Sequence, residues 1–176
     1  MIEFRQSNPD DAAGLSHCVD VVARERRYLA AVCGFTEDET RTFIGSLVEN
    51  GGVQILAFDN GVVVGWCDVS PIPLEGMRHV GRLGMGLLPA YRGQGSGKRL
   101  LAETLDRAFA TGLYRIELDV FASNLTALRL YERAGFVTEG RKRQARILDG
   151  SEEDIVIMGL LHDEWTRLVN DQLAKR

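Results

Sequence analysis

The sequence predicts a mixed α/β fold, and three local patterns carry this prediction. Two β-rich runs, residues 53–58 and 62–69, flank an Asp-Asn-Gly turn, which is typical of a β-hairpin. Further along, a strand that ends at Pro89 is followed by a glycine-rich loop and the start of a helix. The remaining runs alternate between strand and helix periodicity. The 176 residues allow a full hydrophobic core and suggest one domain over residues 1–176.

The N-terminal third predicts a short strand and two helices. Residues 2–6 alternate between polar and apolar side chains, as a strand does. Apolar residues then recur at helical spacing over residues 11–29. Thr36 and Glu39 have the spacing of a capping box, so we expect a second helix from there to about Glu49.

The rest of the chain continues this alternation. One face of the segment after Ser96 is lined by leucine, alanine and phenylalanine, and Gly112 is a good helix terminator. We expect a strand at 79–88, a helix at 96–111, a strand at 115–121, a helix after Asn124, strands at 137–148 and 153–161 around Asp149-Gly150, and an appended helix at about 162–174.

Composition excludes several classes of protein. The chain is 45% hydrophobic and 26% charged, as ordinary globular proteins are, and its net charge of −4 argues against a nucleic-acid partner. Cys18, Cys33 and Cys67 are odd in number and contain no C-x-x-C, so neither a disulfide framework nor a metal site is predicted. No apolar run approaches the ~20 residues that span a bilayer, and no signal peptide is visible. We therefore expect a cytoplasmic protein without a membrane partner.

The junction between the strand and the helix predicts a phosphate site. Gly93, Gly95 and Gly97 allow a tight turn, and the following helix start offers unpaired N–H groups and a positive dipole end. The Walker pattern does not fit, because Gly97-Lys98 is followed by Arg99. The dinucleotide fingerprint fails too, because Lys98 stands where its last glycine should be.

Two blocks resemble motifs of the GCN5-related N-acetyltransferase (GNAT) superfamily. The pattern Arg92-x-x-Gly95-x-Gly97 after a strand that ends in proline resembles motif A, and residues 124–136, NLTALRLYERAGF, resemble motif B. The likeness covers residues 1–161, with its core at 80–136. It is greatest to the branch of ribosomal-protein N-terminal and small-molecule amine acetyltransferases. It implies a mostly antiparallel sheet of six to seven strands, flanked by helices, with a splayed cleft for acetyl-CoA.

The resemblance also implies roles for individual residues. Acetyl-CoA would be the co-substrate, with no metal. The thiolate that leaves during transfer needs a proton donor, and Tyr131 stands where the family places that acid. Asn124 would contact the cofactor and can also cap its helix. The strand at Met85, Gly86 and Leu87 would pair with the pantetheine arm, and the pyrophosphate would be held by Arg92, Gly93, Gln94, Gly95, Ser96, Gly97 and Lys98.

The general base is not evident from the sequence. Many family members carry a glutamate in the strand before motif A, but residues 80–88 contain no carboxylate. The candidates are His79, Asp68, Glu25 or a water relay. Asp68 interrupts an apolar strand, which fits either contact with substrate or a solvent-facing position. Cys67 is better explained as a small buried residue than as a nucleophile.

The missing carboxylate favours an acceptor that is easily deprotonated. A lysine-like amine costs ~4.6 kcal/mol to deprotonate at neutral pH, whereas an α-amine costs only ~1 to 1.4 kcal/mol. The α-amine of an amino acid, an analogue or a peptide N-terminus is therefore the favoured partner, and polyamines and aminoglycosides stay open. So do a cofactor-binding sensor without transferase activity, an acyl group other than acetyl, and a homodimer.

Overall fold

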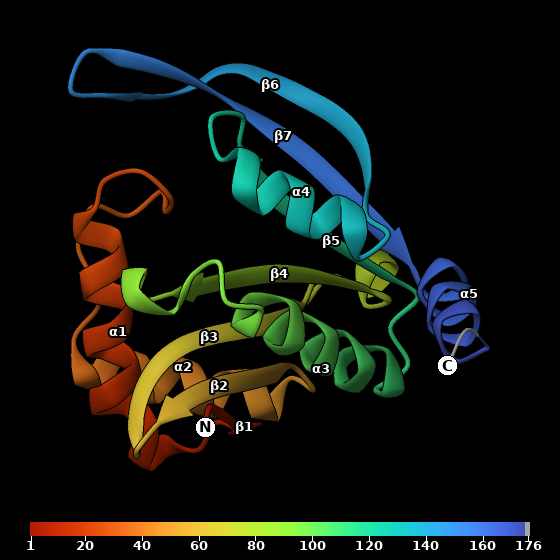
Figure 1. Ribbon diagram of the computed structural model, residues 1–176, viewed down its shortest axis with the longest axis horizontal. Coiled ribbons are helices and arrows are strands. Elements are labelled where there is room, and N and C mark those ends of the chain that lie inside the picture. Colours follow the sequence, from red (N-terminus) through yellow and green to blue (C-terminus); the bar gives the residue numbers. More distant parts are fainter. Residues whose placement is uncertain (175–176) are drawn as a thin grey trace.

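The computed structural model describes residues 1–174, so residues 175–176 of the predicted domain lie outside it. Its centre is a seven-stranded sheet in the order β1-β2-β3-β4-β5-β7-β6 (Figure 1). Neighbouring strands are antiparallel except β4 and β5, which confirms the mostly antiparallel sheet. The strands are β1 (Glu3–Gln6), β2 (Val53–Asp59), β3 (Val62–Pro71), β4 (Val80–Leu87), β5 (Arg115–Phe121), β6 (Val137–Leu148) and β7 (Ser151–Leu161).

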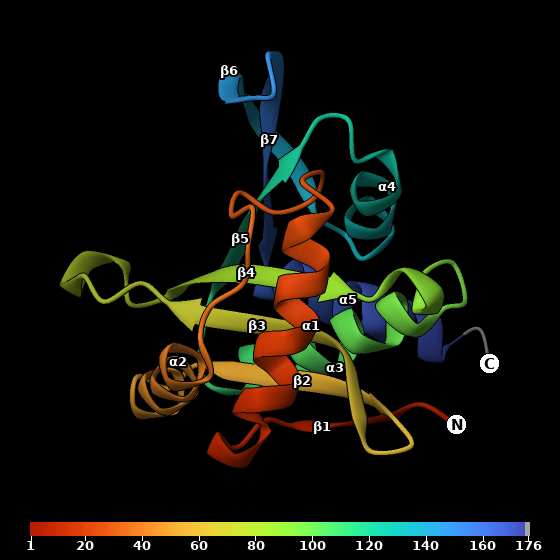
Figure 2. The same cartoon turned by 90° about the vertical axis from the view of Figure 1, so that its left-hand side faces the viewer.

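Helices cover both faces of the sheet, and α1 crosses in front of β2, β3 and β4 in Figure 2. The helices are α1 (Ala12–Arg24), α2 (Glu37–Glu49), α3 (Ser96–Ala110), α4 (Leu125–Arg133) and α5 (His162–Leu173), with 3-10 turns at Pro9–Asp11, Glu75–Met77 and Pro89–Tyr91. Side-chain alternation along β2 divides the core. Leu56 packs with the apolar side chains of α1 and α2, whereas Ile55 packs with those of α3 and α4.

The predicted capping box is confirmed. The Glu39 N–H donates to Thr36 Oγ1 at 3.2 Å, and the Thr36 N–H donates to Glu39 Oε2 at 2.8 Å. The predicted end of the first helix is wrong, because α1 stops at Arg24 rather than near Leu29. Arg26 has a φ of 58°, in the left-handed region, and this backbone turns the chain away from the helix axis.

The sheet opens between β4 and β5. These strands pair over three residues only, Val80 to Arg82 against Arg115 to Glu117. Beyond Arg82, β4 continues with β3 as its partner while β5 follows β7, and the two strands diverge (Figure 1). From Leu83 onward, one edge of β4 therefore has no strand partner within the described chain.

Candidate active site

The loop after β4 presents backbone N–H groups at the start of α3. Gly93 and Gly95 have φ values of 72° and 85°, a conformation that glycine adopts without strain, and Gly95 is the N-cap of α3. Within residues 1–174, the N–H groups of residues 93–98 donate no main-chain or side-chain hydrogen bond. The first turn of α3 contains no acidic side chain. These groups and the positive end of the helix dipole suit an anion such as phosphate.

The predicted loop residues differ in what their side chains do. Lys98 is exposed at the rim, and Gln94 Nε2 donates to the Ala90 carbonyl at 2.7 Å, which braces the loop. Gly97 lies between β4 and α4. A Cβ built at this position would stand 3.2 Å from Leu87 Cδ1 and 3.7 Å from Leu130 Cδ2, so glycine allows close packing here.

Arg92 has partners that the sequence did not indicate. Its Nε donates to the Leu87 carbonyl and its Nη1 to Glu25 Oε2, both at 2.8 Å, and its guanidinium stacks over the Tyr28 ring at 4.7 Å. Arg92 thus ties the end of α1 to the loop. The same contacts occupy Glu25, one of the candidate bases, because its carboxylate accepts a second bond from Arg92. Sixty-seven residues separate this pair, and no local pattern reveals it.

The open edge of β4 includes Met85, Gly86 and Leu87. On the other edge, these residues pair with β3, which holds the strand in place. Gly86 faces the indole of Trp66, and a Cβ built there would stand 2.2 Å from the ring. A side chain at this position would displace the strand or the tryptophan. The edge can pair with an extended, amide-containing ligand by strand addition.

Tyr131 and Asn124 come from α4. Asn124 caps the helix by accepting a bond from the Ala127 N–H at 3.2 Å, as expected from its position. Tyr131 is 7% exposed and meets Phe136 edge to face, with 5.7 Å between ring centroids. Burial raises the pKa of the Tyr131 phenol, with the Cys67 thiol adding to the effect. The hydroxyl is therefore held protonated, the form that can donate a proton.

Cys67 lies on β3 and is fully buried. Burial raises the pKa of its thiol, and a hydrogen bond involving Thr104 only partly offsets this. The protonated thiol is a poor nucleophile. The structure thus agrees with its interpretation as a small buried residue.

Asp68 lies on β3 directly opposite Gly84 of β4. A Cβ built at Gly84 would stand 3.6 Å from both carboxylate oxygens, so the missing side chain leaves room beside the acid. Burial raises the pKa of Asp68 to about 7, and the neighbouring Gln54 side chain acts in the opposite direction. Gly84 is two residues beyond the last β4–β5 pair, Arg82–Glu117. The half-buried carboxylate thus lies beside the opening of the sheet, on the face of α1 and α2, rather than simply facing solvent.

The structure does not bring His79 to this opening. His79 is exposed and precedes the first residue of β4, at the opposite end of that strand from the glycine loop. Its carbonyl accepts bonds from the N–H groups of Tyr114 and Arg115, where β4 and β5 are still joined. The structure therefore offers no support for His79 as the base, and that role stays a prediction. Position along the sequence could not show at which end the sheet opens.

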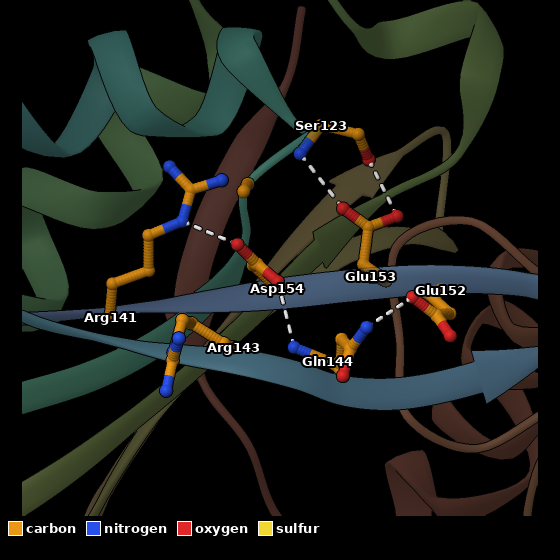
Figure 3. Close-up of a pocket in the computed structure, with 8 residues that line it drawn as sticks. Ser123, Arg141, Arg143, Gln144, Glu152, Glu153 and Asp154 are labelled. Carbon is orange, nitrogen blue, oxygen red and sulfur yellow. Dashed lines mark hydrogen bonds and ion pairs between the residues drawn. The ribbon is translucent and has the colours of Figure 1, made fainter.

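A polar cavity of about 910 Å³ lies at the end of β5 beside the β6–β7 hairpin (Figure 3). Its charged side chains mostly bind one another. Glu153 accepts bonds from the Ser123 N–H at 3.0 Å and its hydroxyl at 3.1 Å, and Asp154 accepts from Arg141 Nε at 2.6 Å and the Gln144 N–H at 2.7 Å. These bonds fix the hairpin against the start of α4. The cavity is lined by Ala122, Ser123, Arg141, Arg143, Gln144, Glu152, Glu153 and Asp154.

The tip of the same hairpin reaches the segment after α1. Arg26 Nε and Nη2 donate to the two oxygens of Asp149 at 2.9 and 2.7 Å, and Arg146 Nη2 donates to the Arg26 carbonyl at 3.1 Å. We name these contacts the Arg26–Asp149 bridge. Arg26, Gln144 and Asp149 have positive φ values of 58°, 48° and 52°, and such backbone strain gathers where surrounding contacts hold it.

Two structural features are absent from residues 1–174. No group of three or more His, Cys, Asp or Glu side chains is placed to hold a metal ion there. None of the helices in that range combines the length and the apolar character needed to cross a membrane.

Comparison with known proteins gives one family. The model described as the acetyltransferase (GNAT) family matches residues 13–136. The chain is 28% identical over 129 residues to the L-amino acid N-acyltransferase MnaT of Escherichia coli (strain K12), which covers 73% of this chain and 72% of that protein. It is 35% identical over 100 residues to the N-alpha-acetyltransferase RimI of Mycobacterium tuberculosis, which covers 54% of this chain and 59% of that protein.

Solved structures agree. A GNAT acetyltransferase from Streptococcus pneumoniae superposes with a TM-score of 0.86 at 29% identity, covering 92% of this chain and 99% of that one. A phosphinothricin acetyltransferase from Sinorhizobium meliloti, in complex with acetyl-CoA, gives 0.85 at 20% identity, with coverages of 91% and 88%. At this lower identity the likeness concerns the fold.

Proposed function

Because the chain belongs to the acetyltransferase (GNAT) family, we propose that it transfers the acetyl group of acetyl-CoA directly to a primary amine. One observation carries the proposal: the unpaired N–H groups of residues 93–98 adjoin the open edge of β4. The first can hold a pyrophosphate, and the second can pair with the amide groups of pantetheine. Acetyl-CoA has both features in one molecule.

In this proposal, the loop and the strand divide the cofactor between them. The amides of residues 93–98 receive the pyrophosphate, with Lys98 as a further positive charge at the rim. Met85, Gly86 and Leu87 pair with the pantetheine arm, and Asn124 lies at its side. The resemblance to motif A implies that Arg92 lies near the pyrophosphate, but its bonds to Glu25 and Leu87 make support of the loop its better-founded role.

The reaction needs one proton removed and one supplied. The amine nitrogen attacks the thioester carbonyl carbon, a C–N bond forms, and the C–S bond breaks to release the thiolate of coenzyme A. Tyr131 supplies the proton that the sulfur takes up, since burial keeps its hydroxyl protonated. Asp68 accepts the proton that the amine loses. Its pKa of about 7 suits this task, because a general base works best near the operating pH.

We infer that the acceptor is the α-amine of an amino acid or an analogue. At a peptide N-terminus an α-amine has a pKa of ~7.7 to 8.0, close enough to that of Asp68 for proton transfer without a stronger base. The α-amine of a free amino acid is more basic, because its own carboxylate stabilises the ammonium form, but it is still a weaker base than a lysine-like amine. The absence of a carboxylate from β4 supports the same class. The relative MnaT is named as an L-amino acid N-acyltransferase, which supports an amino acid as the acceptor. The relative RimI is named as an N-alpha-acetyltransferase. A peptide N-terminus is therefore the second candidate.

A panel of amines tests this proposal. Release of free thiol from acetyl-CoA is measured with amino acids, short peptides, polyamines and aminoglycosides, and the acetylated product is identified by mass spectrometry. We expect the highest kcat/KM with an amino acid. Preference for peptides would move the acceptor to protein N-termini. Cofactor binding without thiol release on any amine would favour a sensor that binds acyl-CoA.

A further inference from the structure

Gln54 stands out among the buried side chains of residues 1–174. It is 2% exposed, and its Oε1 is a buried side-chain oxygen with no hydrogen-bond partner. An unsatisfied buried polar atom destabilises the fold, and an apolar residue of similar shape would avoid this cost. The neighbours of Gln54 along β2, Ile55 and Leu56, are apolar and buried, so the amide is an exception in this part of the strand.

The Gln54 amide lies next to a carboxylate on the neighbouring strand. Gln54 and Asp68 are directly opposite in the β2–β3 register, and Asp68 is directly opposite Gly84 in the β3–β4 register. The three residues therefore form one row across three strands. The Gln54 side chain lies beside the Asp68 carboxylate and lowers its pKa, while the glycine at the end of the row leaves the space beside that carboxylate open.

We propose that Gln54 is a positioning residue for the transfer reaction: its amide donates to Asp68 and orients the carboxylate toward the acceptor amine at the Gly84 end of the row. This inference rests on the proposed function, in which Asp68 is the base. It explains why an amide with an orphaned oxygen is kept in a buried strand: the donor end serves the reaction at a cost to stability. Asp68 itself lies close enough to the opening to touch substrate, whereas Gln54 acts through Asp68.

Among the polar side chains around Asp68, Gln54 is the one that affects the pKa of its carboxylate. The pKa of Asp68 responds to burial, which raises it, and to Gln54, which lowers it; no Arg, Lys or His of the described chain contributes. Cys67 is the neighbouring titratable group, and its raised pKa keeps it neutral. From β4 the facing residue is Gly84, which has no side chain.

The test uses Gln54→Met, which keeps the length of the side chain and removes the donor. We expect kcat to fall by roughly tenfold or more, as part of the ~10²- to 10⁴-fold contribution of a general base, with an unchanged dissociation constant for acetyl-CoA. The midpoint of urea unfolding should stay or rise, since the orphaned oxygen is removed. The acidic limb of the kcat/KM profile should move to higher pH, because the carboxylate loses a hydrogen bond that stabilises its charged form.

Thr40→Val is the matched control. Thr40 is a buried polar residue on α2 whose hydroxyl donates to the Thr36 carbonyl, so this variant loses a buried hydrogen bond away from Asp68. It should lower stability without moving the pH profile. A Gln54→Met protein with unchanged kcat and an unmoved pH profile would overturn the inference. So would a parallel loss of stability and cofactor binding, which marks a purely structural role.

A second measurement keeps the inference separate from the proposed function. The Asp68 carboxyl carbon is titrated by NMR in the wild-type protein and in Gln54→Met, without cofactor or amine. A higher midpoint in the variant supports the pair even if no amine proves to be a substrate, in which case only the proposed reaction fails. Identical midpoints would contradict the pair, even in a fully active enzyme.

Discussion

At the residue scale, Asp68 shows how the surroundings of one strand position raise the pKa of a carboxylate toward the value that a general base needs. Its carboxylate combines partial burial, a single amide partner and an empty position on the adjacent strand. A carboxylate in this setting is less stable in its charged form than the same group in the unfolded chain. The position therefore weakens the fold near neutral pH, which is a common trade at catalytic sites.

This trade predicts a pH-dependent effect of Asp68→Asn. The pKa of Asp68 is about 7 in the folded protein, against ~3.9 in an unfolded chain, so folding takes up a proton between these values and stability falls as pH rises through this window. The amide that replaces the carboxylate in this variant does not titrate. It should be more stable than wild type at pH 8, by about 1 to 4 kcal/mol, and should lose this advantage near pH 4.

Urea unfolding at both pH values measures the difference. Asp171→Asn, at an exposed position on α5, is the control for removing a surface carboxylate. An advantage of Asp68→Asn that is equal at pH 4 and pH 8 would contradict the raised pKa.

The variant Tyr131→Phe tests the proposed role of Tyr131 as the proton donor to the leaving thiolate. The variant keeps the ring that packs edge to face against Phe136 and removes only the hydroxyl, so stability and the dissociation constant of acetyl-CoA should stay near wild type. Loss of a proton donor should lower kcat by roughly 10²-fold or more. Rates equal to wild type, measured by thiol release at saturating substrates, would remove Tyr131 from this role.

At the scale of elements, local chemistry predicted most of the fold. The Asn60-Gly61 turn, the Thr36 capping box and the Asn124 cap are fixed by neighbours within a few residues, and each is found where expected. The end of α1 was missed, because helical periodicity continues past Arg24 while the backbone turns at Arg26. That turn is held by Asp149, which no local pattern can reveal.

The Arg26–Asp149 bridge predicts a local change in dynamics. Both side chains are well exposed, 43% and 65%, so the pair contributes only about 0.2 to 1 kcal/mol. Asp149→Asn removes the charge but suits the same left-handed backbone. Hydrogen exchange of residues 25–36 should then speed up by at most ~5-fold, and added salt should have a similar effect on the wild type. Exchange rates that stay the same in Asp149→Asn and at higher salt would show that the bridge does not restrain this segment.

At the scale of the whole molecule, the site is assembled from parts far apart in the chain. The residues that the motifs indicated, Gly95 in the loop and Tyr131 on α4, lie on elements that meet at Gly97 and Leu130. The partners that complete the site were not predictable. Gln54 lies on another strand and looks like any polar residue in the sequence, and Glu25 is linked to Arg92 only by the path of the chain. Strand register decides the first pairing, and the packing of the end of α1 against the loop after β4 decides the second.

The most direct test of the account is the affinity for acetyl-CoA of Gly95→Glu beside that of Gly112→Glu. Both glycines have positive φ, 85° and 98°, and a Cβ at either would meet nothing within 4 Å, so the two changes bring equal charge and similar backbone strain. Calorimetric titration should show that Gly95→Glu loses cofactor binding, because its carboxylate lies at the proposed phosphate site, while Gly112→Glu binds like wild type. Equal affinities in the two variants would contradict the assignment of this loop and, with it, the proposed transfer reaction.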